Sequence, residues 1–498
     1  MKERINEGRR NVIKAAGLTG VAIMCGLSEK LIEARSVSPG FIKRAEIPYW
    51  YKSGELRDFV KLLDQKNELV KIKEEVDPKH EIGSLLWQNE HNRKGVIFEN
   101  VRGSNIPVIG GIYQDWRRIG LSLGVTGRFG PYEMYDLFRS AMAKPISPKE
   151  VKSAYWKDVI LTGDRIDMSK LPVPTLFERD GGPYITAGVG VCKNPETNAY
   201  NLGVYRMQVI EKGKILVWAF PGSDLHYIYK AYEKMGKEMD FAVVIGAEPT
   251  IFTTAVSKVP PDIDEISVAG ALKNKEIEVT RCETVDLLIP SSAEIVIEGK
   301  IDPKIRNMDG PFADHGGIYK GGPSPALKIS AICHRKDAFF HTILSGDSME
   351  HCTTSEILAC FWARNILEHL QSKFERVKDV NLFWRDGAKK WIVVSLWEKK
   401  SNKEPREIIK EVFNFSTAKY RMLPVSSFLR TAIIVNEDID IYDSKEVAWA
   451  VGTRLIDCMV IEEDKAKGYE LRIGLDATLP IGVSLEKYKR AKTKPINL

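Results

Sequence analysis

The sequence predicts a mixed fold, α+β in the first part of the chain and α/β in the last part. Helix-like and strand-like segments are interspersed from about residue 54. A long middle stretch contains short apolar runs separated by turn residues, which is typical of antiparallel strands. After about residue 379, strands and helices alternate along the chain, which favours a mainly parallel sheet. With 498 residues, 44% of them hydrophobic, the chain can bury several cores.

The N-terminal domain is predicted to be a compact α+β unit over residues 41–167. Its helices show helical spacing of apolar residues, and its strands are short β-like runs bounded by turn residues. The expected helices are 56–65 and 80–91, and the expected strands are 68–72, 95–101 and 106–113. The proline-rich stretch 168–186 marks a boundary, because the residue before a proline favours extended chain.

The central domain, residues 168–350, is predicted to be rich in antiparallel strands. The turns "NPETN" and "EKGK" join three of them into a meander. The expected strands lie within 184–194, 199–211, 214–220, 241–247, 276–290, 293–301 and 326–335, with one helix at 225–236. So many strands with a single helix between them indicate a β-barrel or a sandwich.

The last third is predicted to begin with a linker helix over residues 351–378, whose segment 354–374 is strongly amphipathic. The α/β domain follows over residues 379–475, where alternating strands and helices form the βαβ pattern. We expect this domain to mediate oligomerisation. A tail covers residues 476–498.

The charge balance argues against a nucleic-acid partner. The net charge of +6 comes from 73 Lys+Arg against 67 Asp+Glu. The first 40 residues hold seven basic and four acidic side chains, so the remainder of the chain is nearly balanced. A nucleic-acid-binding domain normally shows a clear basic excess.

The seven cysteines show no C-x-x-C pair, so neither a zinc site nor a dense disulfide framework is indicated. We expect them to act as small buried hydrophobic residues, and a lone catalytic thiol is the alternative. The cysteines are Cys25, Cys192, Cys282, Cys333, Cys352, Cys360 and Cys458.

Residues 1–40 are predicted to be a twin-arginine export signal. Arg9 and Arg10 precede an apolar run from Ala15 to Leu27, which is too short to span a bilayer comfortably. That route carries folded proteins, so the predicted location is the periplasm or another exported one. The alternative is an ordinary amphipathic first helix, in which case the protein is cytoplasmic.

The stretch "NLGVYR" places an arginine among apolar neighbours. On one continuous strand, Arg206 would share a face with Leu202 and Val204, opposite Asn201. An arginine that faces a barrel interior needs an anionic partner, and its guanidinium is well shaped for a carboxylate. The alternative is an exposed arginine on an edge strand.

The stretch "MDGPFADHGGIYKGG", residues 308–322, sets Asp309 and Asp314 in a glycine-rich segment that we expect to be a loop. A loop that holds a carboxyl group away from water raises its pKa, so that the group stays protonated and can donate a proton. His315 could orient one of the two acids. The alternative is a turn or a cation-binding loop.

Three further features bear on chemistry. Asn201, His226 and Glu265 give an O, N and O ligand set that suits a divalent ion such as Mn²⁺. The acidic run 436–446 is interpreted as structural, with Asp443 or Ser444 as the N-cap of a helix. Trp218 could line a pocket, although most tryptophans are expected in the core.

Five ordered stretches carry a resemblance to a known family. They are "ITAGVGVCKNPETNAYNLGVYRMQV", "DEISVAGAL", "SAEIVIEG", "MDGPFADHGGIY" and "IIVNEDIDIYDSKEVAWAVGTR". Together they resemble the UbiD-type decarboxylases, from about residue 54 to about residue 470. The resemblance implies that the central domain is a split β-barrel that binds a flavin.

The resemblance also implies the cofactors: prenylated FMN with Mn²⁺, and K⁺ as a further candidate ion. Asn201, His226 and Glu265 would bind the Mn²⁺ that bridges to the cofactor phosphate. The implied cofactor-binding residues are Asn201, Leu202, Gly203, Val204, Tyr205, Arg206, His226 and Arg430. A flavin prenyltransferase would supply the cofactor.

The implied reaction is the reversible decarboxylation of an aromatic or α,β-unsaturated carboxylic acid, with CO₂ as the small product. The flavin would carry the organic chemistry, while the protein positions groups and supplies a proton. Arg206 would bind the carboxylate, Asp314 would donate the proton, and Asp309 would tune the arginine and relay charge. The implied assembly is a homodimer or a homohexamer.

Two positions depart from the family pattern. Asp309 stands where glutamate is common, so its contact to Arg206 is expected to be looser or to need a local backbone adjustment. Arg430 stands where a lysine commonly reaches the cofactor phosphate, which keeps the charge and alters the geometry. Two other functions stay open: a non-catalytic subunit of a multi-subunit carboxylase, and an FMN-dependent reductase.

Overall fold

The computed structural model describes residues 54–385, 390–415, 429–461 and 471–491. The chain divides into two compact units between Leu358 and Ala359, and each is described by itself. The predicted export signal, residues 1–40, lies outside the described residues. Within those residues, no helix is both long and apolar enough to cross a membrane.

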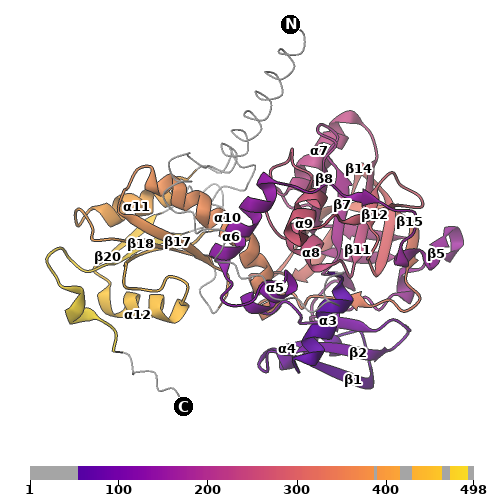
Figure 1. The fold of residues 1–498 in the computed structure, drawn as a ribbon, viewed down its shortest axis with the longest axis horizontal. Helices are drawn as coiled ribbons and strands as arrows, with labels where there is room; N and C mark the ends of the chain where they lie inside the picture. Colours follow the sequence, from indigo (N-terminus) through magenta and orange to yellow (C-terminus); the bar gives the residue numbers. More distant parts are fainter. Residues whose placement is uncertain (1–53, 386–389, 416–428, 462–470, 492–498) are drawn as a thin grey trace, which may run out of the picture. The chain divides into compact units, whose positions relative to one another are not determined.

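The N-terminal part of the first unit has two helices beside a small sheet (Figure 1). Its elements are α3 (Leu56–Gln65), α4 (Glu81–Glu90), β1 (Leu69–Val76), β2 (Gly95–Val101) and β3 (Val108–Gly110). The predicted helix 56–65 and strand 95–101 are confirmed at both ends. Helix α3 buries Leu56, Phe59, Val60 and Leu63, which lie three and four residues apart on one face.

A second group of short elements links this part to the rest of the unit. It comprises α5 (Trp116–Ser122), α6 (Pro131–Ala143), β4 (Lys149–Glu150), β12 (Glu278–Arg281) and β13 (Leu288–Pro290). The three strands form a sheet in the order β13-β12-β4. Single turns of 3₁₀ helix lie at Tyr155–Lys157, Gly163–Arg165, Met168–Lys170 and Leu485–Tyr488.

The central sheet has nine strands, and all its pairings are antiparallel. The strands are β5 (Val159–Thr162), β6 (Tyr184–Ile185), β7 (Val189–Lys193), β8 (Tyr200–Val204), β9 (Met207–Glu211), β10 (Lys214–Val217), β11 (Met239–Ile245), β14 (Ile295–Ala313) and β15 (Tyr319–His334). Their order is β6-β9-β10-β15-β14-β11-β7-β8, with β5 beside β15. The hairpin of β14 and β15 forms the long middle of the sheet.

The predicted closed or split barrel is not confirmed, because no sheet among the described strands closes on itself. Strand β8 is one edge of the central sheet. The backbone N–H of Leu202 on β8 donates to the carboxylate of Glu265 instead of to a further strand. The side chain of Glu265 therefore pairs a backbone N–H group of this edge strand, so the sheet does not have to close to pair it.

Three helices, and not the single predicted one, lie within the central part. They are α7 (Asp224–Met235), α8 (Pro249–Ala255) and α9 (Glu265–Lys273). Every residue of α8 is buried, and so are seven of the nine residues of α9. A helix buried nearly all round has no apolar stripe, so the periodicity that predicts helices is missing there. Both α8 and α9 pack against β8 (Figure 1).

The first two predicted domains are interleaved in the structure. Strand β5 pairs with β15 of the central sheet, although it lies within the predicted domain 41–167. Strand β16 (Phe340–His341) pairs in parallel with β3 of the N-terminal sheet. Side chains from both sheets also share one hydrophobic cluster, which contains Val96 and Val243. One continuous core therefore supports both sheets.

The second unit is a five-stranded sheet in the order β17-β18-β19-β21-β20. Its strands are β17 (Val377–Phe383), β18 (Trp391–Leu396), β19 (Thr431–Asn436), β20 (Asp457–Ile461) and β21 (Arg472–Ala477). The inner strands β18, β19 and β21 are parallel, while β17 and β20 are antiparallel edges. The sheet is therefore mixed: its three inner strands are parallel, as the alternating pattern predicted, but two of its four pairings are antiparallel.

Helices cover both faces of this second sheet (Figure 1). They are α11 (Glu404–Phe413) and α12 (Ser444–Arg454), while α10 (Met349–Gln371) spans the division between the units. Ile408 of α11 packs in one cluster and Val447 of α12 in another, so the two helices bury opposite faces. Asp443 caps α12 by accepting the N–H groups of Lys445 and Glu446, which confirms the predicted N-cap.

The described cysteines are mostly buried, as predicted. Cys192, Cys333, Cys352 and Cys360 are buried, Cys282 is partly buried and Cys458 is exposed. Burial raises the pKa of the Cys192 and Cys333 thiols, the latter to about 12. A high thiol pKa disfavours the reactive thiolate.

Candidate active site

Arg206 lies in a break between two strands. Strand β8 ends at Val204 and β9 begins at Met207, so the continuous strand predicted over 199–211 is interrupted at Tyr205 and Arg206. Strand β8 pairs with β7, whereas β9 pairs with β10 and β6. The break frees Arg206 from the strict alternation of a strand.

The side chain of Arg206 forms a buried ion pair with Asp309. Its Nε and Nη2 both donate to Oδ2 of Asp309, at 3.0 and 2.5 Å. The two side chains are 8% and 0% exposed. The guanidinium carbon also lies 4.1 Å from the ring centre of Trp218 and 4.9 Å from that of Phe312. Arg206 is therefore held on two aromatic faces, and the alternative of an exposed edge arginine is wrong.

Asp309 belongs to a β-hairpin, and the loop predicted for residues 308–322 is wrong. Strand β14 continues to Ala313 and β15 begins at Tyr319, so the turn itself is short. The register shifts between Asp309 and Phe312. Gly310 has φ +105°, and a Cβ there would lie 2.7 Å from Cα of Gly321, so glycine allows the two strands to approach. The contact between Asp309 and Arg206 is close, so the looser contact expected from the short side chain of Asp309 is not found.

Tyr184 completes this group, although no pattern in the sequence pointed to it. Tyr184 lies on β6 opposite Gln208 of β9, two residues beyond Arg206. Its hydroxyl and Oδ1 of Asp309 are both buried without a partner in normal hydrogen-bond geometry. The two side chains interact weakly with each other, and the hydrogen bond from Tyr184 opposes the rise in the pKa of Asp309. Burial is the main cause that raises the pKa of Asp309, and the charge of Arg206 opposes that rise. Burial and the negative charge of Asp309 both raise the pKa of Tyr184.

Asp314 stands at the turn of the same hairpin and is held as an anion. Its carboxylate accepts from Nζ of Lys320 at 2.5 Å and from the N–H of Gly316 at 2.7 Å. Burial by itself raises the pKa of Asp314, but the Lys320 hydrogen bond and the charge of His315 bring that pKa below its ordinary value. Asp309 and Asp314 were both predicted as candidates for a raised pKa, and only the pKa of Asp309 is raised.

Two of the three predicted ion ligands lie together. Asn201 is buried on β8, next to Leu202, whose N–H donates to Glu265. The side-chain amide of Asn201 donates to the hydroxyl of Tyr205 at 3.4 Å, which leaves its carbonyl oxygen for a cation. Tyr205 packs so closely on β8 that a Cβ at Gly203 would lie 2.2 Å from its hydroxyl oxygen.

His226 has different neighbours from Asn201 and Glu265. Burial lowers the pKa of His226, and the charges of Lys230 and Arg306 lower it further, while Glu233 opposes them. Within the described residues, no group of three or more His, Cys, Asp and Glu side chains is placed to hold a metal ion. His226 as a ligand therefore stays a prediction.

The remaining predicted residues are placed as follows. Leu202, Gly203 and Val204 lie on β8, and the first two are buried. Arg430 precedes β19 in the second unit, where its carbonyl accepts the N–H of Ile473. A contact of Arg430 with a cofactor phosphate stays a prediction.

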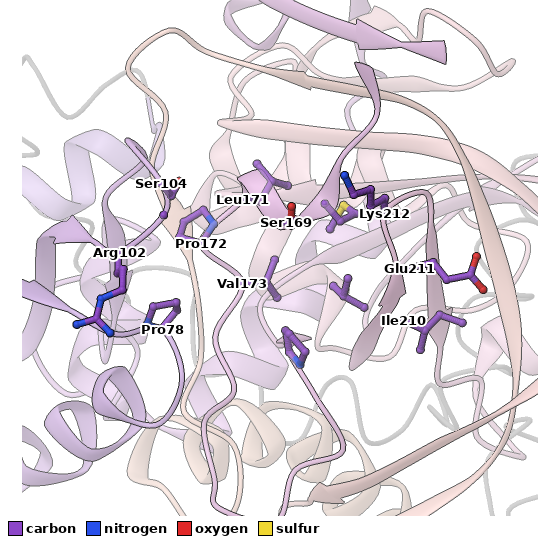
Figure 2. Close-up of a pocket in the computed structure, with 14 residues that line it drawn as sticks. Pro78, Arg102, Ser104, Ser169, Leu171, Pro172, Val173, Ile210, Glu211 and Lys212 are labelled. Carbon is purple, nitrogen blue, oxygen red and sulfur yellow. The ribbon is translucent and has the colours of Figure 1, made fainter. Parts of the chain in front are cut away.

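A pocket of about 360 Å³ lies elsewhere in the first unit (Figure 2). Its labelled lining residues include Arg102, Val173 and Lys212, and neither Arg206 nor Asp309 lines it. Arg102 pairs with Glu75 and Asp77 at 3.0 and 2.8 Å, and Lys212 pairs with Asp167 at 2.9 Å. Its basic side chains thus have acidic partners already, so we do not assign the catalytic site to it.

Comparison with known proteins shows which family the chain resembles. Models of the 3-octaprenyl-4-hydroxybenzoate carboxy-lyase family match residues 60–130 (N-terminal domain), 149–348 (Rift-related domain) and 356–457 (C-terminal domain). The anhydromevalonate phosphate decarboxylase of Methanothermobacter thermautotrophicus is 29% identical over 449 residues, which cover 87% of this chain and 99% of that protein.

Solved structures of UbiD-class enzymes share the fold. HmfF from Pelotomaculum thermopropionicum, in complex with FMN, is 28% identical with a TM-score of 0.77 over 88% of this chain and 97% of that one. An evolved dimeric form of HmfF, in complex with prenylated FMN, is 29% identical with a TM-score of 0.74, over 86% and 96%. With three domain models in chain order over most of its length, this chain belongs to the UbiD family of carboxy-lyases.

Proposed function

We propose that this protein catalyses the reversible decarboxylation of an α,β-unsaturated or aromatic carboxylic acid with prenylated FMN. The observation that carries the proposal is the buried group of Arg206, Asp309 and Tyr184. It holds one cation, one acid of raised pKa, and two buried polar atoms that have only a weak hydrogen bond to each other. Buried polar atoms are rarely left so poorly paired, and such exceptions are typical of functional sites.

Arg206 binds the substrate carboxylate in this proposal. Asp309 takes the N–H groups of Nε and Nη2, which leaves Nη1 for the substrate. The rings of Trp218 and Phe312 restrict the guanidinium and shield it from water. A carboxylate is bound more strongly by a fixed, desolvated guanidinium than by a mobile one in water.

The residues present fit the cofactor and its ion. The weakly paired Asp309 oxygen and Tyr184 hydroxyl provide polar contacts, and the oxygens of Asn201 and Glu265 suit a hard divalent cation such as Mn²⁺. When bound, prenylated FMN supplies the reactive ring for breaking the bond between the substrate carbon and its carboxylate.

Asp314 supplies the proton that the carbon needs after CO₂ has left. In the structure Asp314 is paired with Lys320, so it must part from that lysine and gain a proton before it can donate one. Asp309 keeps Arg206 oriented and balances its charge during the reaction.

The test begins with the purified protein from cells that also express a flavin prenyltransferase. We expect a prenylated-flavin mass, bound Mn²⁺, and exchange of ¹³C-bicarbonate into at least one acid from a panel of acrylic and aromatic acids. Anhydromevalonate phosphate is the first acid to test, because a relative acts on it. Arg206→Ala should remove the exchange.

Two results would contradict the proposal. Protein without any flavin and without exchange would indicate a non-catalytic subunit. Protein with ordinary FMN that oxidises NADH would indicate a reductase.

We further propose that the protein is exported and self-associates. Replacing Arg9 and Arg10 by lysine should strand active enzyme in the cytoplasm, and an unchanged distribution would contradict export. Light scattering should give the mass of a homodimer or a homohexamer, whereas a monomer would contradict self-association. K⁺ binding is checked by omitting K⁺ from the exchange assay.

A further inference from the structure

Gln208 links two segments of the chain next to Asp309. Its side-chain nitrogen donates to the carbonyl of Gly181 at 2.9 Å, and its side-chain oxygen accepts the N–H of Gly310 at 3.1 Å. Gln208 is 5% exposed, so both hydrogen bonds lie out of water and are stronger for it. The N–H of Gly310 belongs to the peptide bond that follows Asp309. Gln208 therefore binds the backbone directly beside the acid of the candidate active site.

Two residues of β14 lie outside the regular pairing with β15. The register shifts between Asp309 and Phe312, with Gly310 and Pro311 between them. Backbone groups that leave a strand ladder need other partners. The N–H of Gly310 has Gln208 as its partner. A side chain therefore replaces a strand as the partner of this backbone.

The loop 177–183 is bound to the same stretch of β14 at further points. The N–H of Gly181 donates to the carbonyl of Pro311 at 2.7 Å. The carboxylate of Asp180 accepts the N–H of Ala313 at 3.0 Å. The irregular stretch of β14 is therefore held from this loop as well as from β9.

Arg206 and Gln208 hold consecutive residues of the hairpin. Arg206 donates to the carboxylate of Asp309, and Gln208 accepts the N–H of Gly310. The side chain of Asp309 is short and fully buried, so its carboxylate can move only a little relative to its own backbone. The position of the backbone at Gly310 therefore decides whether one oxygen of Asp309 meets both N–H groups of Arg206.

We propose that Gln208 is a positioning residue for the pair of Arg206 and Asp309, and that it acts by fixing the peptide between Asp309 and Gly310. The inference rests on the proposed function, because this pair is the proposed carboxylate-binding group. It adds a residue that acts on the reaction through another side chain.

An amide is the side chain that this place requires. The N–H of Gly310 needs an acceptor and the carbonyl of Gly181 needs a donor, and an amide or a protonated carboxyl group offers both. A carboxylate would accept from Gly310 but would face the carbonyl of Gly181 without a donor. Its charge would also compete with Asp309 for Arg206. The ionisable groups on the neighbouring segments are Arg206, Asp309, Asp180 and Tyr184.

The first measurement is amide hydrogen exchange of the full-length protein, read by mass spectrometry on peptides that contain residues 308–313. Gln208→Met keeps the length of the side chain and removes both hydrogen bonds, so the N–H of Gly310 should exchange at least about tenfold faster. Gln114→Met is the matched control. Gln114 is also a buried glutamine, which donates to the carbonyl of Lys94 at 3.1 Å, and its replacement should leave these peptides unchanged.

The second measurement is the kinetics of decarboxylation with an acid from the panel that exchanges CO₂. Gln208→Met should lower kcat/KM about 10- to 100-fold, and Gln114→Met should leave it unchanged. Gln208→Glu should be as poor as Gln208→Met at high pH. It should recover towards the parent as the pH falls, because a protonated carboxyl group both donates and accepts, whereas Gln208→Met should not recover.

The inference is overturned if the N–H of Gly310 exchanges equally fast in Gln208→Met and in the parent, or if exchange is faster and kcat/KM is unchanged. If Gln208→Met does not fold, Gln208→Glu decides, because a role through these hydrogen bonds requires its recovery at low pH. If no acid exchanges CO₂, the proposed function fails and a crystal structure of Gln208→Met decides. Loss of either hydrogen bond from Arg206 to Asp309 then supports the inference, and an unchanged pair contradicts it.

Discussion

Arg206 donates two N–H groups to one oxygen of Asp309, and the other oxygen of that carboxylate is buried with only a weak hydrogen bond from Tyr184. A poorly paired acceptor of this kind is costly, since a buried acceptor left without a partner costs about 1–3 kcal/mol. It leaves Oδ1 as the atom that can accept a proton or a hydrogen bond from a bound molecule. The pair therefore combines a fixed cation with an acid of raised pKa.

Replacing Asp309 by asparagine tests whether its charge matters. The amide keeps the shape but cannot balance the charge of Arg206, so we expect kcat to fall at least about 100-fold. Flavin content, measured by absorbance, should stay unchanged. Asp309→Glu keeps the carboxylate on a longer side chain, and should keep much of the activity. Wild-type kcat in Asp309→Asn would remove this residue from the mechanism.

The contact between Asp314 and Lys320 predicts a change in the pH profile. Asp314 donates only while protonated, and Lys320 holds the pKa of Asp314 below its ordinary value. Lys320→Met should raise that pKa, so activity should persist to higher pH than in the parent. The measurement is kcat against pH. Lys214→Met is the matched control, because Lys214 pairs with Glu211 at 2.7 Å on a neighbouring strand.

Asp314→Asn separates proton supply from charge. It removes the donor, and we expect a loss of about 100- to 10,000-fold in kcat with the cofactor still bound. If Asp314→Asn has the same kcat as the parent, another group donates the proton. In that case Lys320→Met should also leave the pH profile of kcat unchanged.

Most regular elements could be predicted from the sequence because they have a clear pattern. Helix α3 has one apolar face, and β2 is a short apolar run between turn residues, so both are found with the right ends. Helices α8 and α9 are buried almost all round and have no such pattern. Strand β5 pairs with a strand more than 160 residues away, and β16 pairs with one more than 230 residues away. A local sequence pattern does not predict pairings between segments so far apart.

The candidate site was predictable only in part. The resemblance named Arg206, Asp309, Asn201 and Glu265, and the structure brings them together as two close pairs. The break at Arg206 has no local signal, since residues 199–211 alternate like one strand. Tyr184 was missed because its place beside Arg206 and Asp309 depends on which strand pairing the fold selects.

Tyr184 predicts different effects on stability and on activity. Its buried hydroxyl is only weakly hydrogen-bonded, to Asp309, so Tyr184→Phe should leave the unfolding temperature nearly unchanged. If the hydroxyl contacts the substrate, kcat/KM should fall about tenfold in the same variant. Tyr200→Phe is the control, since its hydroxyl accepts the N–H of Leu288 at 2.8 Å and its removal should lower the unfolding temperature. Unchanged kcat/KM in Tyr184→Phe would leave Tyr184 without a role in the reaction.

Glu90 and Glu350 predict how stability depends on pH. Burial is the main cause that raises the pKa of each to about 7. The charge of Glu350 raises the pKa of Glu90 further, whereas backbone N–H groups oppose the rise at both carboxyl groups and the charge of Arg118 opposes it at Glu350. The folded-state pKa lies above the ordinary 4.5, so the folded protein binds more protons than the unfolded chain between these values. The stabilisation is complete below about pH 4.5 and is lost as the pH rises through about 7. From pH 6 to pH 8, the free energy of unfolding should therefore fall by on the order of 1 kcal/mol for each group.

Thermal unfolding at both pH values checks this, and Glu90→Gln should reduce the difference because one of the two titrating groups is gone. An unfolding temperature that rises from pH 6 to pH 8 would mean that both carboxyl groups are already ionised in the folded protein.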